Sequence, residues 1–446
     1  MKDKVNIMLI LPENVKYIIN TLEENGFKAF AVGGCVRDSL LGKTPDDWDI
    51  TTSAKPENVM ALFKKTVPTG IKHGTVTVLI DSIPYEVTTF RTDGKYTDSR
   101  HPESVSFAQN IEDDLSRRDF TVNAMAYNEE RGLIDIFGGK KDLESKIIRC
   151  VGDAKTRFSE DALRMMRAVR FSAQHSFKIE EKTLDAIKIK AHLIKNVSAE
   201  RIKTELDKIL LSPNPDIFLT LFETGLLDCI IPELSACFKT EQHIKYHLFD
   251  VGNHTMHVVK NVPPVLHLRY AALFHDLGKP EMKTTDEFGV DHFKGHAEVS
   301  VSLADKICTR LKFDNSTKDK VLRLIKHHDR EIKIGAKYVK RAVFCVGDDI
   351  FCDLINLKIA DAKGQNPEFV SERFAVYDEL LKIYKEVKEK KEPFSVKNLA
   401  INGNDLIALG LSGKEIGKAL NDALLYVIDN PKENEKNKLL KFLEKS

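Results

Sequence analysis

The sequence predicts an α+β head followed by an all-α neck, body and tail. Strand-like runs and glycine turns are concentrated in the first 140 residues, whereas helical spacing of apolar residues dominates from Asp142 to the end. The length of 446 residues exceeds the usual domain size of about 100–200 residues, which indicates several domains. The expected divisions are a catalytic head at 1–140, a neck at 141–240, a body at 241–370 and a tail at 371–446.

The N-terminal segment predicts a helix, a strand and a glycine turn in succession. Residues 13–30 have amphipathic spacing that Gly26 closes, and the strand that follows ends in a pair of glycines. Two later runs have strand composition and are separated by a turn-like Asp-Ser-Ile-Pro segment. The expected strands are Phe27–Val32, Thr75–Ile80 and Tyr85–Phe90.

Beyond Gly138 the pattern is almost wholly helical. Apolar positions recur with a helical period in nine segments, and a charged stretch at 385–392 precedes a tail that Gly410, Gly413 and Gly417 punctuate. The expected helices are 159–174, 180–190, 198–211, 216–224, 254–262, 266–276, 297–311, 317–328 and 370–389.

Composition places the chain among water-soluble proteins. Hydrophobic residues make up 42% and charged residues 30%, and no apolar run is long enough to cross a bilayer. The first twelve residues lack the small-residue cleavage site of a secretory signal, and the seven cysteines form no CxxC pair. We expect a cytoplasmic protein with reduced thiols and no membrane partner. The net charge of +1 means that any RNA binding depends on local basic patches.

A phosphate-binding turn is expected between the first strand and the next helix. Gly33 and Gly34 occupy this turn, where free backbone N–H groups at a helix start attract an anion. Arg37 follows within the first helical turn and can add a charged fork to the same phosphate.

Two carboxylates follow shortly afterwards. On an extended strand, Asp47 and Asp49 point to the same side, where together they can hold divalent metal. Two magnesium ions held there would activate an attacking hydroxyl and neutralise a leaving pyrophosphate. Glu86, on an expected strand, is a candidate third carboxylate. A lone Asp-x-Asp pair is more often a solvated acidic turn, but the glycine turn upstream favours the catalytic interpretation.

These motifs resemble the nucleotidyltransferase superfamily of DNA polymerase β, and specifically the class II tRNA nucleotidyltransferase and bacterial poly(A) polymerase family. The resemblance implies a polymerase-β-like head with a mixed sheet and helices. The run 117–124 is similar to the family's second motif, which implies that Arg118, Asp119 and Asn123 bind the ribose and triphosphate of a nucleotide. The polar run 91–102 is similar to the family's mobile loop, although either stretch alone could be a solvated loop.

A third motif contains residues suited to reading a base. Cytosine and adenine both present an amino donor beside a ring-nitrogen acceptor, so an aspartate that accepts and an arginine that donates suit both bases. Asp161 and Arg164 fit this pattern and resemble the family's base-reading motif, whereas the structural alternative is a helical salt bridge. Arg167 and Arg170 are then partners of the triphosphate or of the protein. The run 198–206 resembles the family's fifth motif, and we expect it to support the neck without a catalytic residue.

The C-terminal half contains a second set of metal-binding side chains, in the order typical of HD-domain phosphohydrolases. Imidazole and carboxylate ligands suit manganese, iron, nickel or zinc. His257, His292 and His327 are weaker candidates, because the sequence does not determine which neighbour points inward. The expected ligands are His254, His275, Asp276, His296, His328 and Asp361.

The resemblance implies that the chain adds CCA to the 3′ end of tRNA from CTP and ATP, with magnesium at the head and a phosphohydrolase in the HD domain. DNA is not an expected partner, and the oligomeric state is left open. The nearest alternatives are a poly(A) polymerase or an enzyme that adds only A or only CC. A more distant alternative is an HD nucleotide phosphohydrolase whose head has become a regulatory nucleotide-binding module.

Overall fold

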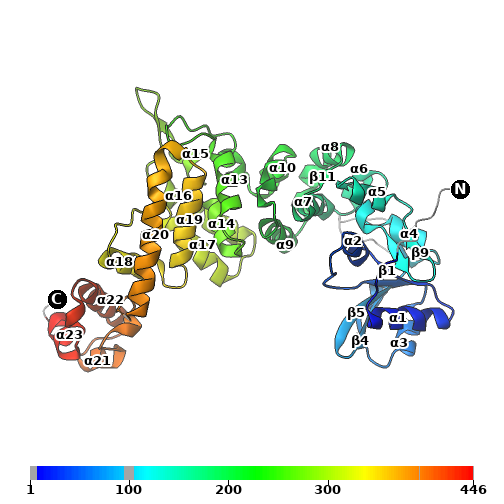
Figure 1. Cartoon of the computed structure of the whole chain (residues 1–446), viewed down its shortest axis with the longest axis horizontal. Helices are drawn as coiled ribbons and strands as arrows, with labels where there is room; N and C mark the ends of the chain where they lie inside the picture. The colour runs from blue at the N-terminus through cyan, green and yellow to red at the C-terminus, as the bar shows by residue number, and fades with distance from the viewer. Residues whose placement is uncertain (1–7, 95–104, 391, 445–446) are drawn as a thin grey trace. The chain divides into compact units, whose positions relative to one another are not determined.

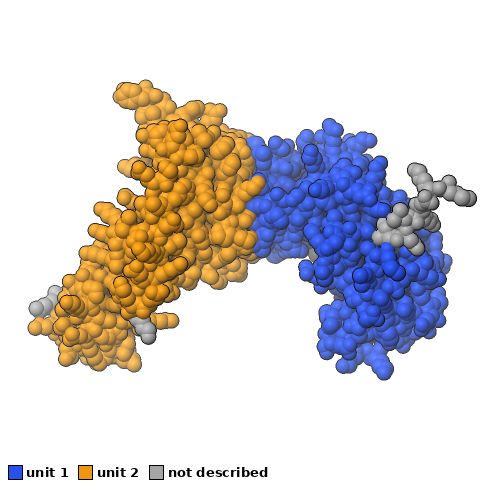
Figure 2. Space-filling view, viewed as in Figure 1, with its two compact units in different colours: residues 1–230 blue, residues 231–446 orange. Residues whose placement is uncertain are grey.

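The computed structural model describes residues 8–94, 105–390 and 392–444. The chain divides into two compact units, residues 1–230 and residues 231–446 (Figure 2). This division falls inside the range 141–240, which the sequence analysis treats as one neck. The four predicted domains therefore stay a prediction.

Unit 1 is built on a mixed seven-stranded sheet in the order β3-β4-β5-β2-β1-β8-β9. Figure 1 labels β1, β4, β5 and β9 of this sheet. Only β2 and β5 run parallel, and the other neighbours in this sheet are antiparallel. The strands of the sheet are β1 (Ala29–Val32), β2 (Ile50–Thr52), β3 (Thr66–Gly70), β4 (Thr75–Ile80), β5 (Ile83–Thr89), β8 (Ala126–Asn128) and β9 (Gly132–Ile134). Two further pairs are β6 (Arg91–Asp93) with β7 (Val105–Phe107) and β10 (Ile147–Ile148) with β11 (Lys178–Ile179).

The α+β class and the three expected strands are confirmed. All four residues of β1 are buried, which explains its continuous apolar sequence. The turn between β4 and β5 places Asp81 and Ser82 at positive φ, so the chain reverses within two residues. The predicted loop at 91–102 begins as β6, and its residues 95–102 lie outside the described part of the chain.

The remaining elements of unit 1 are helices that cover the sheet and form the neck. The predicted single helix 159–174 is wrong: α6 ends at Glu160 and α7 starts at Leu163, because Asp161 has an extended backbone. Ser159, expected as a cap, lies inside α6, and Asp153 caps that helix instead. The helices are α1 (Glu13–Glu24), α2 (Gly34–Leu40), α3 (Pro56–Leu62), α4 (Ile111–Ser116), α5 (Gly139–Glu144), α6 (Ala154–Glu160), α7 (Leu163–His175), α8 (Glu181–Lys190), α9 (Ala199–Leu210), α10 (Phe218–Glu223) and α11 (Leu226–Ile230).

Unit 2 is helical apart from the short antiparallel pair β12 (Thr284–Thr285) and β13 (Asp291–His292). The five helices predicted between 254 and 389 are confirmed, with ends that differ by a few residues. Two helices of this unit, α18 and α19, were not predicted. The helices are α12 (Pro232–Cys237), α13 (Val251–Asn261), α14 (Leu266–Phe274), α15 (Lys279–Met282), α16 (His296–Arg310), α17 (Asn315–His327), α18 (Ala336–Val346), α19 (Phe351–Lys363), α20 (Pro367–Glu389), α21 (Gly403–Ala408), α22 (Lys414–Asp429) and α23 (Lys436–Leu443).

Two features of composition have structural counterparts. All seven cysteines are free thiols, and Cys35, Cys150, Cys237 and Cys308 are buried. Among the described residues, no helix combines the length and the apolar character that crossing a bilayer requires.

Candidate active site and candidate metal centre

Asp47 and Asp49 lie in the segment that leads into β2. The ladder with β1 starts at Ile50, so the expected strand does not extend back to Asp47. The carbonyl of Asp49 still accepts a hydrogen bond of 3.0 Å from the N–H of Val32, which ties this segment to the end of β1. Both aspartates are exposed, as a site open to an incoming substrate requires.

Glu86 joins this carboxylate pair from the neighbouring strand. β2 and β5 pair in parallel with Ile50 opposite Val87, which places Glu86 beside Asp49 at the edge of the ladder. Desolvation, together with the charges of Asp47 and Glu86, raises the pKa of Asp49 to about 6 against the opposing effect of Arg118. Carboxylates that repel one another in this way are suited to a bound cation. Asp47, Asp49 and Glu86 do not form one of the tight ligand groups found among the described residues; both of those groups lie in unit 2.

The glycine turn makes room for an arginine. Gly33 has a φ of +83°, and a Cβ atom there would lie 2.8 Å from Nη1 of Arg118. The sequence predicted a free N–H at Gly33, but this N–H donates to the carbonyl of Met125 and is therefore occupied. The structure therefore presents the guanidinium of Arg118 at the turn, close to Asp49. Gly34 is the first residue of α2.

A buried carboxylate fixes Arg118 in this place. Asp114 is fully buried, and its Oδ2 accepts from Nη2 of Arg118 at 3.3 Å and from the hydroxyl of Thr51 at 3.4 Å. Its Oδ1 accepts from Arg117 at 2.8 and 3.0 Å. Burial opposes ionisation, but the two guanidinium groups outweigh it and lower the pKa of Asp114. Asp114 thus joins the arginine segment to the strand that follows Asp49, a role that the sequence analysis missed.

Four predicted nucleotide-binding residues form one network. Nη1 of Arg37 donates to Oδ1 of Asn123 at 2.6 Å, and Nδ2 of Asn123 donates to Oδ1 of Asp119 at 3.2 Å. Oδ2 of Asp119 accepts from Nε of Arg167 at 2.7 Å. Burial opposes ionisation of Asp119, but Arg167 outweighs it and holds the pKa at about 2. Arg37 also bonds Asp38, so its fork is occupied by protein groups.

A cleft of about 250 Å³ brings the two predicted nucleotide motifs together. One wall comes from the Arg-Arg-Asp run, and the other from Asp161, the first turns of α7 and α9. A larger cavity of about 570 Å³ lies beside α6 and α8 and contains none of the predicted site residues. The cleft is lined by Arg117, Arg118, Asp119, Asp161, Leu163, Arg164, Arg167 and Arg201.

Asp161 and Arg164 both line the cleft, but they do not pair with each other. Oδ2 of Asp161 accepts from Nη2 of Arg201 at 2.9 Å, and its Oδ1 accepts from the N–H of Leu163. Nη1 of Arg164 donates to Glu160 at 2.6 Å, so the helical salt bridge considered as the structural alternative is absent. Arg201 belongs to the run 198–206, to which the sequence analysis assigned no catalytic residue.

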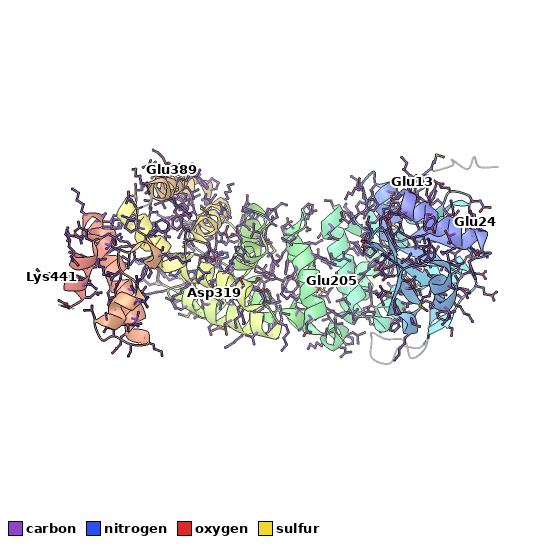
Figure 3. The ribbon with its side chains drawn as sticks, turned by 90° about the horizontal axis from the view of Figure 1, so that it is seen from below. Glu13, Glu24, Glu205, Asp319, Glu389 and Lys441 are labelled. Carbon is purple, nitrogen blue, oxygen red and sulfur yellow. The ribbon has the colours of Figure 1, made fainter. Side chains whose placement is uncertain are left out.

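Arg170 is paired with protein groups. Its Nε donates to Oε2 of Glu205 at 2.5 Å, and its Nη1 donates to Gln174. Glu205 lies on α9 (Figure 3), and both charged groups of the pair are buried. The pair joins α7 to α9, and Arg170 does not line the cleft.

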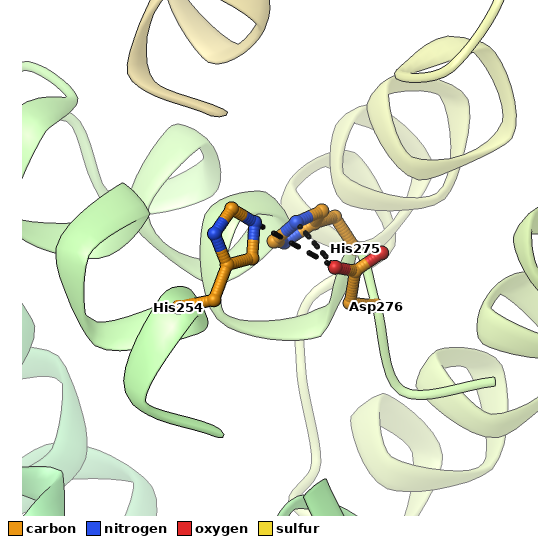
Figure 4. A group of neighbouring side chains, drawn as sticks. All are labelled: His254, His275 and Asp276. Atoms are coloured by element: carbon orange, nitrogen blue, oxygen red, sulfur yellow. Dashed lines mark ion pairs between the residues drawn. The ribbon is translucent and has the colours of Figure 1, made fainter. Parts of the chain in front are cut away.

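In unit 2, the six predicted ligands converge on one place. Nε2 of His254 lies 2.9 Å from Oδ1 of Asp361 and 3.7 Å from Oδ2 of Asp276. Nε2 of His275 lies 3.1 Å from the same Oδ2 (Figure 4). On the other side, Oδ1 of Asp276 lies 3.4 Å from Nε2 of His296 and 3.8 Å from Nε2 of His328. Asp276 therefore stands between two groups of imidazoles, one at each oxygen.

The four predicted histidine ligands make the same kind of contact through Nδ1, and this contact favours one tautomer of the ring. In each ring Nδ1 lies within hydrogen-bond distance of a backbone carbonyl, at 3.1 Å for His254, 2.8 Å for His275, 2.9 Å for His296 and 2.7 Å for His328. An Nδ1–H that donates to a carbonyl leaves Nε2 with a free lone pair, which is the arrangement of a metal-bound imidazole.

This centre has the chemistry of a metal site. The described residues hold two tight ligand groups, His254 with His275 and Asp276, and Asp276 with His296 and His328. Nε2 of His275 is buried and makes no hydrogen bond with a described residue, although Oδ2 of Asp276 lies 3.1 Å away, and such an arrangement suits a shared cation. Burial lowers the pKa of His296, which keeps its imidazole neutral for ligation.

The weaker histidine candidates lie elsewhere. His257 stacks on Phe249, and His292 pairs with Asp286 at the surface. His327 belongs to neither ligand group. Lys279 was not a predicted site residue, yet its Nζ lies 2.7 Å from Oδ2 of Asp276.

Family models match three stretches of the chain. Residues 29–149 match "Poly A polymerase head domain", and residues 176–238 match "Probable RNA and SrmB- binding site of polymerase A". Residues 244–362 match "HD domain".

Curated relatives and solved structures agree with these matches. A CCA-adding enzyme of Pediococcus pentosaceus is 36% identical over 97% of this chain and 98% of that protein. One from Geobacillus thermodenitrificans is 52% identical over 47% of this chain and 52% of that protein. The Bacillus stearothermophilus CCA-adding enzyme in complex with CTP matches with a TM-score of 0.72 and 30% identity, over 98% of each chain. The Thermotoga maritima enzyme complexed with tRNA shares the fold, with a TM-score of 0.61 and 22% identity over 99% of this chain and 98% of that chain.

Proposed function

The chain belongs to the family of CCA-adding enzymes, and on this premise we propose how its own residues add CCA to the 3′ end of tRNA from CTP and ATP. The observation that carries the proposal is the position of Arg118. Its guanidinium lies at the glycine turn beside Asp49 and also lines the cleft that contains Asp161. One nucleotide can therefore place its triphosphate at magnesium held by the carboxylates while its base lies at Asp161.

The chemistry is an in-line displacement at the α-phosphate. The 3′ oxygen of tRNA forms a bond to the α-phosphorus, its proton leaves, and the bond to the bridging oxygen breaks to release pyrophosphate. Asp47 and Asp49, with Glu86 beside them, would hold magnesium. Such ions lower the pKa of the attacking hydroxyl and neutralise the leaving group. Arg118 supplies a positive charge on the triphosphate side.

Base selection depends on the cleft. Asp161 keeps free lone pairs and can accept from the amino group of cytosine or adenine, while Arg164 donates to the ring nitrogen. Uracil and guanine would present a carbonyl to the carboxylate and an N–H to the guanidinium. A site that leaves buried polar groups unpaired with the wrong base discriminates against that base by about 10⁴-fold or more.

The test uses the purified chain with tRNA that lacks its 3′ end. Supplied with CTP and ATP together, the protein is expected to add CCA and then stop, and UTP or GTP should give no product. Addition of A alone, of CC alone or of a long A tail would instead identify one of the partial enzymes or a poly(A) polymerase. Phosphate contacts from lysines and arginines should make tRNA binding weaken as salt rises.

We propose a second activity for unit 2, hydrolysis of a phosphate ester at the histidine and aspartate cluster. Asp276 would share its two oxygens between two ions, with His254, His275 and Asp361 on one side and His296 and His328 on the other. Two ions so placed would activate water and clamp the phosphate. Water adds to phosphorus, the P–O ester bond breaks, and the products are an alcohol and inorganic phosphate. Release of phosphate from a panel of esters by the manganese-loaded chain tests this activity.

A further inference from the structure

The metal centre opens into a cleft whose far wall lies outside the matched HD domain. A cavity of about 340 Å³ contains Asp276, His296, His328 and Asp361, and a second of about 430 Å³ adjoins it. The two share Asp329, Lys358, Arg373 and Tyr377, so these side chains stand where the two cavities adjoin. The HD match ends at residue 362, whereas α20 begins at Pro367.

One face of α20 forms this wall. Arg373, Val376, Tyr377 and Leu380 follow the i, i+3, i+4, i+7 spacing of a single helix face, and all four line the second cavity. The side chains of this wall are polar beside the metal centre and apolar farther from it. Arg373 and Tyr377 also line the cavity of the metal centre, whereas Val376 and Leu380 line only the second cavity.

Arg373 is oriented toward the metal ligands. Its Nη1 donates to Oε1 of Gln365 at 3.1 Å, and Nε2 of Gln365 donates to Oδ2 of Asp361 at 3.0 Å. Its guanidinium also lies 5.8 Å from the ring centre of Tyr246. These contacts place a cation beside the site of the phosphate while leaving further N–H donors, because a guanidinium has five.

Lys358 has a different role. Its Nζ donates to the carbonyls of His328 and Arg330 at 2.6 and 2.7 Å, and the side chain is buried. It therefore positions the segment that carries His328. Asp329 and Glu331 also line the second cavity, which offers acceptors for N–H or O–H groups there.

We propose that this face of α20 is the substrate-binding wall of the metal centre, which selects phosphate esters with a flat ring in their organic group, such as nucleoside monophosphates. Arg373 binds a phosphate oxygen. Tyr377, with Leu380 and Ile332 nearby in the same cavity, packs against the ring. The inference rests on the proposed phosphohydrolase, and it adds the substrate class and the residues that select it.

The experiment compares adenosine 5′-monophosphate with methyl phosphate, which lacks a ring, on the manganese-loaded full chain. Tyr377→Ala is expected to lower kcat/KM for the nucleotide about tenfold and to leave methyl phosphate unchanged. Tyr377→Phe keeps the ring and should retain the wild-type ratio of the two substrates. Equal losses on both substrates in Tyr377→Ala would overturn the inference.

Equilibrium binding gives a readout that does not depend on turnover. In calorimetric titrations, Arg373→Met is expected to weaken binding of inorganic phosphate at least tenfold, with partial recovery in Arg373→Lys. Lys382→Ala, on α20 but outside the cavity, is the matched control. Unchanged phosphate binding in Arg373→Met would contradict the proposed wall.

The two proposals fail in different ways. If no ester is hydrolysed while the nucleotide binds in a manner that depends on Tyr377, the phosphohydrolase is wrong and the wall remains. If esters are hydrolysed but the variants match wild type, the wall is wrong and the phosphohydrolase remains. Absence of both hydrolysis and nucleotide binding overturns both.

Discussion

Arg201 is the partner of Asp161, with 2.9 Å between Nη2 and Oδ2. The pair joins α9 to the residue that interrupts α6 and α7. The second predicted base-reading residue, Arg164, bonds Glu160 instead. Asp161 and Arg164 are therefore held in the cleft by different partners.

Loss of Arg201 should impair nucleotide selection. In Arg201→Ala the carboxylate of Asp161 loses a charge-assisted hydrogen bond worth about 1.5–3 kcal/mol. We expect kcat/KM for CTP and ATP to fall at least tenfold, and the preference over UTP to fall as well. Primer-extension kinetics on tRNA lacking its 3′ end measure both. Lys203→Ala, on the same helix and paired with Asp207, is the control, and an unchanged CTP-to-UTP ratio in Arg201→Ala would count against the role of the pair.

Asp114→Asn tests the placement of Arg118. The substitution keeps the shape but removes the buried charge that holds Arg117 and Arg118, so we expect KM for CTP to rise about tenfold. Stability should fall by about 1–3 kcal/mol, as measured by urea denaturation. Asp113→Asn changes an exposed neighbour and should do neither. A loss of stability with unchanged KM would show a purely structural carboxylate.

The two proposed activities should separate by mutation. Asp47→Ala removes a carboxylate of the head and is expected to abolish nucleotide addition while phosphate release continues. His275→Ala removes a buried ligand of unit 2 and is expected to do the reverse. Both assays are run on each variant, and parallel loss of both activities in either one would refute independent sites.

Metal should stabilise the fold of unit 2. A ligand that binds only the folded state adds about 2.7 kcal/mol at a concentration of 100 times its Kd. We therefore expect chelation to lower the unfolding temperature and manganese to restore it, as followed by calorimetry. His275→Ala should weaken this response, since it removes one side chain of the group formed by His254, His275 and Asp276. A response to manganese that is the same in His275→Ala would place the stabilising ion elsewhere.

Acid should destabilise unit 1 through His175. Its ring stacks on Phe171, and neither ring nitrogen has a hydrogen-bond partner among the described residues. Burial lowers its pKa to about 4, with help from Arg37 and Lys43 and against Asp38. The unfolded chain binds this proton near pH 6.5, so stability contributed by neutral His175 is present above that pH and is lost as pH falls toward 4.

The measurement is the free energy of unfolding of wild type and His175→Phe between pH 7 and pH 4.5. Phenylalanine keeps an aromatic ring at the site and has no proton to bind, so the variant should lose less stability over this range. The difference is on the order of 1–3 kcal/mol. If the free energy of unfolding falls equally with pH in the two proteins, His175 does not contribute to the acid sensitivity.

Much of the fold was predictable because its signals are local. The apolar runs of β1 and β4 and the periodicity of α13, α16 and α17 depend on neighbours within one element. The break at Asp161 was not predictable in this way, since it depends on a hydrogen bond to Leu163 and on Arg201, forty residues away. A helix-forming sequence is thus interrupted by a contact that periodicity does not contain.

By itself, the sequence determined which chemical groups are available: the carboxylates at 47 and 49, the arginine-rich motifs, and the six expected metal ligands that include Asp276. Residue type and order are enough for that, because each group carries its chemistry wherever it lies. Only the tertiary structure decided the partners, such as Arg201 with Asp161, Asp114 with Arg118, and the wall of α20 beside the metal centre. Apart from Asp114 and Arg118, which lie four residues apart, these contacts depend on packing between elements distant in the chain, and no local pattern encodes which side chains meet there.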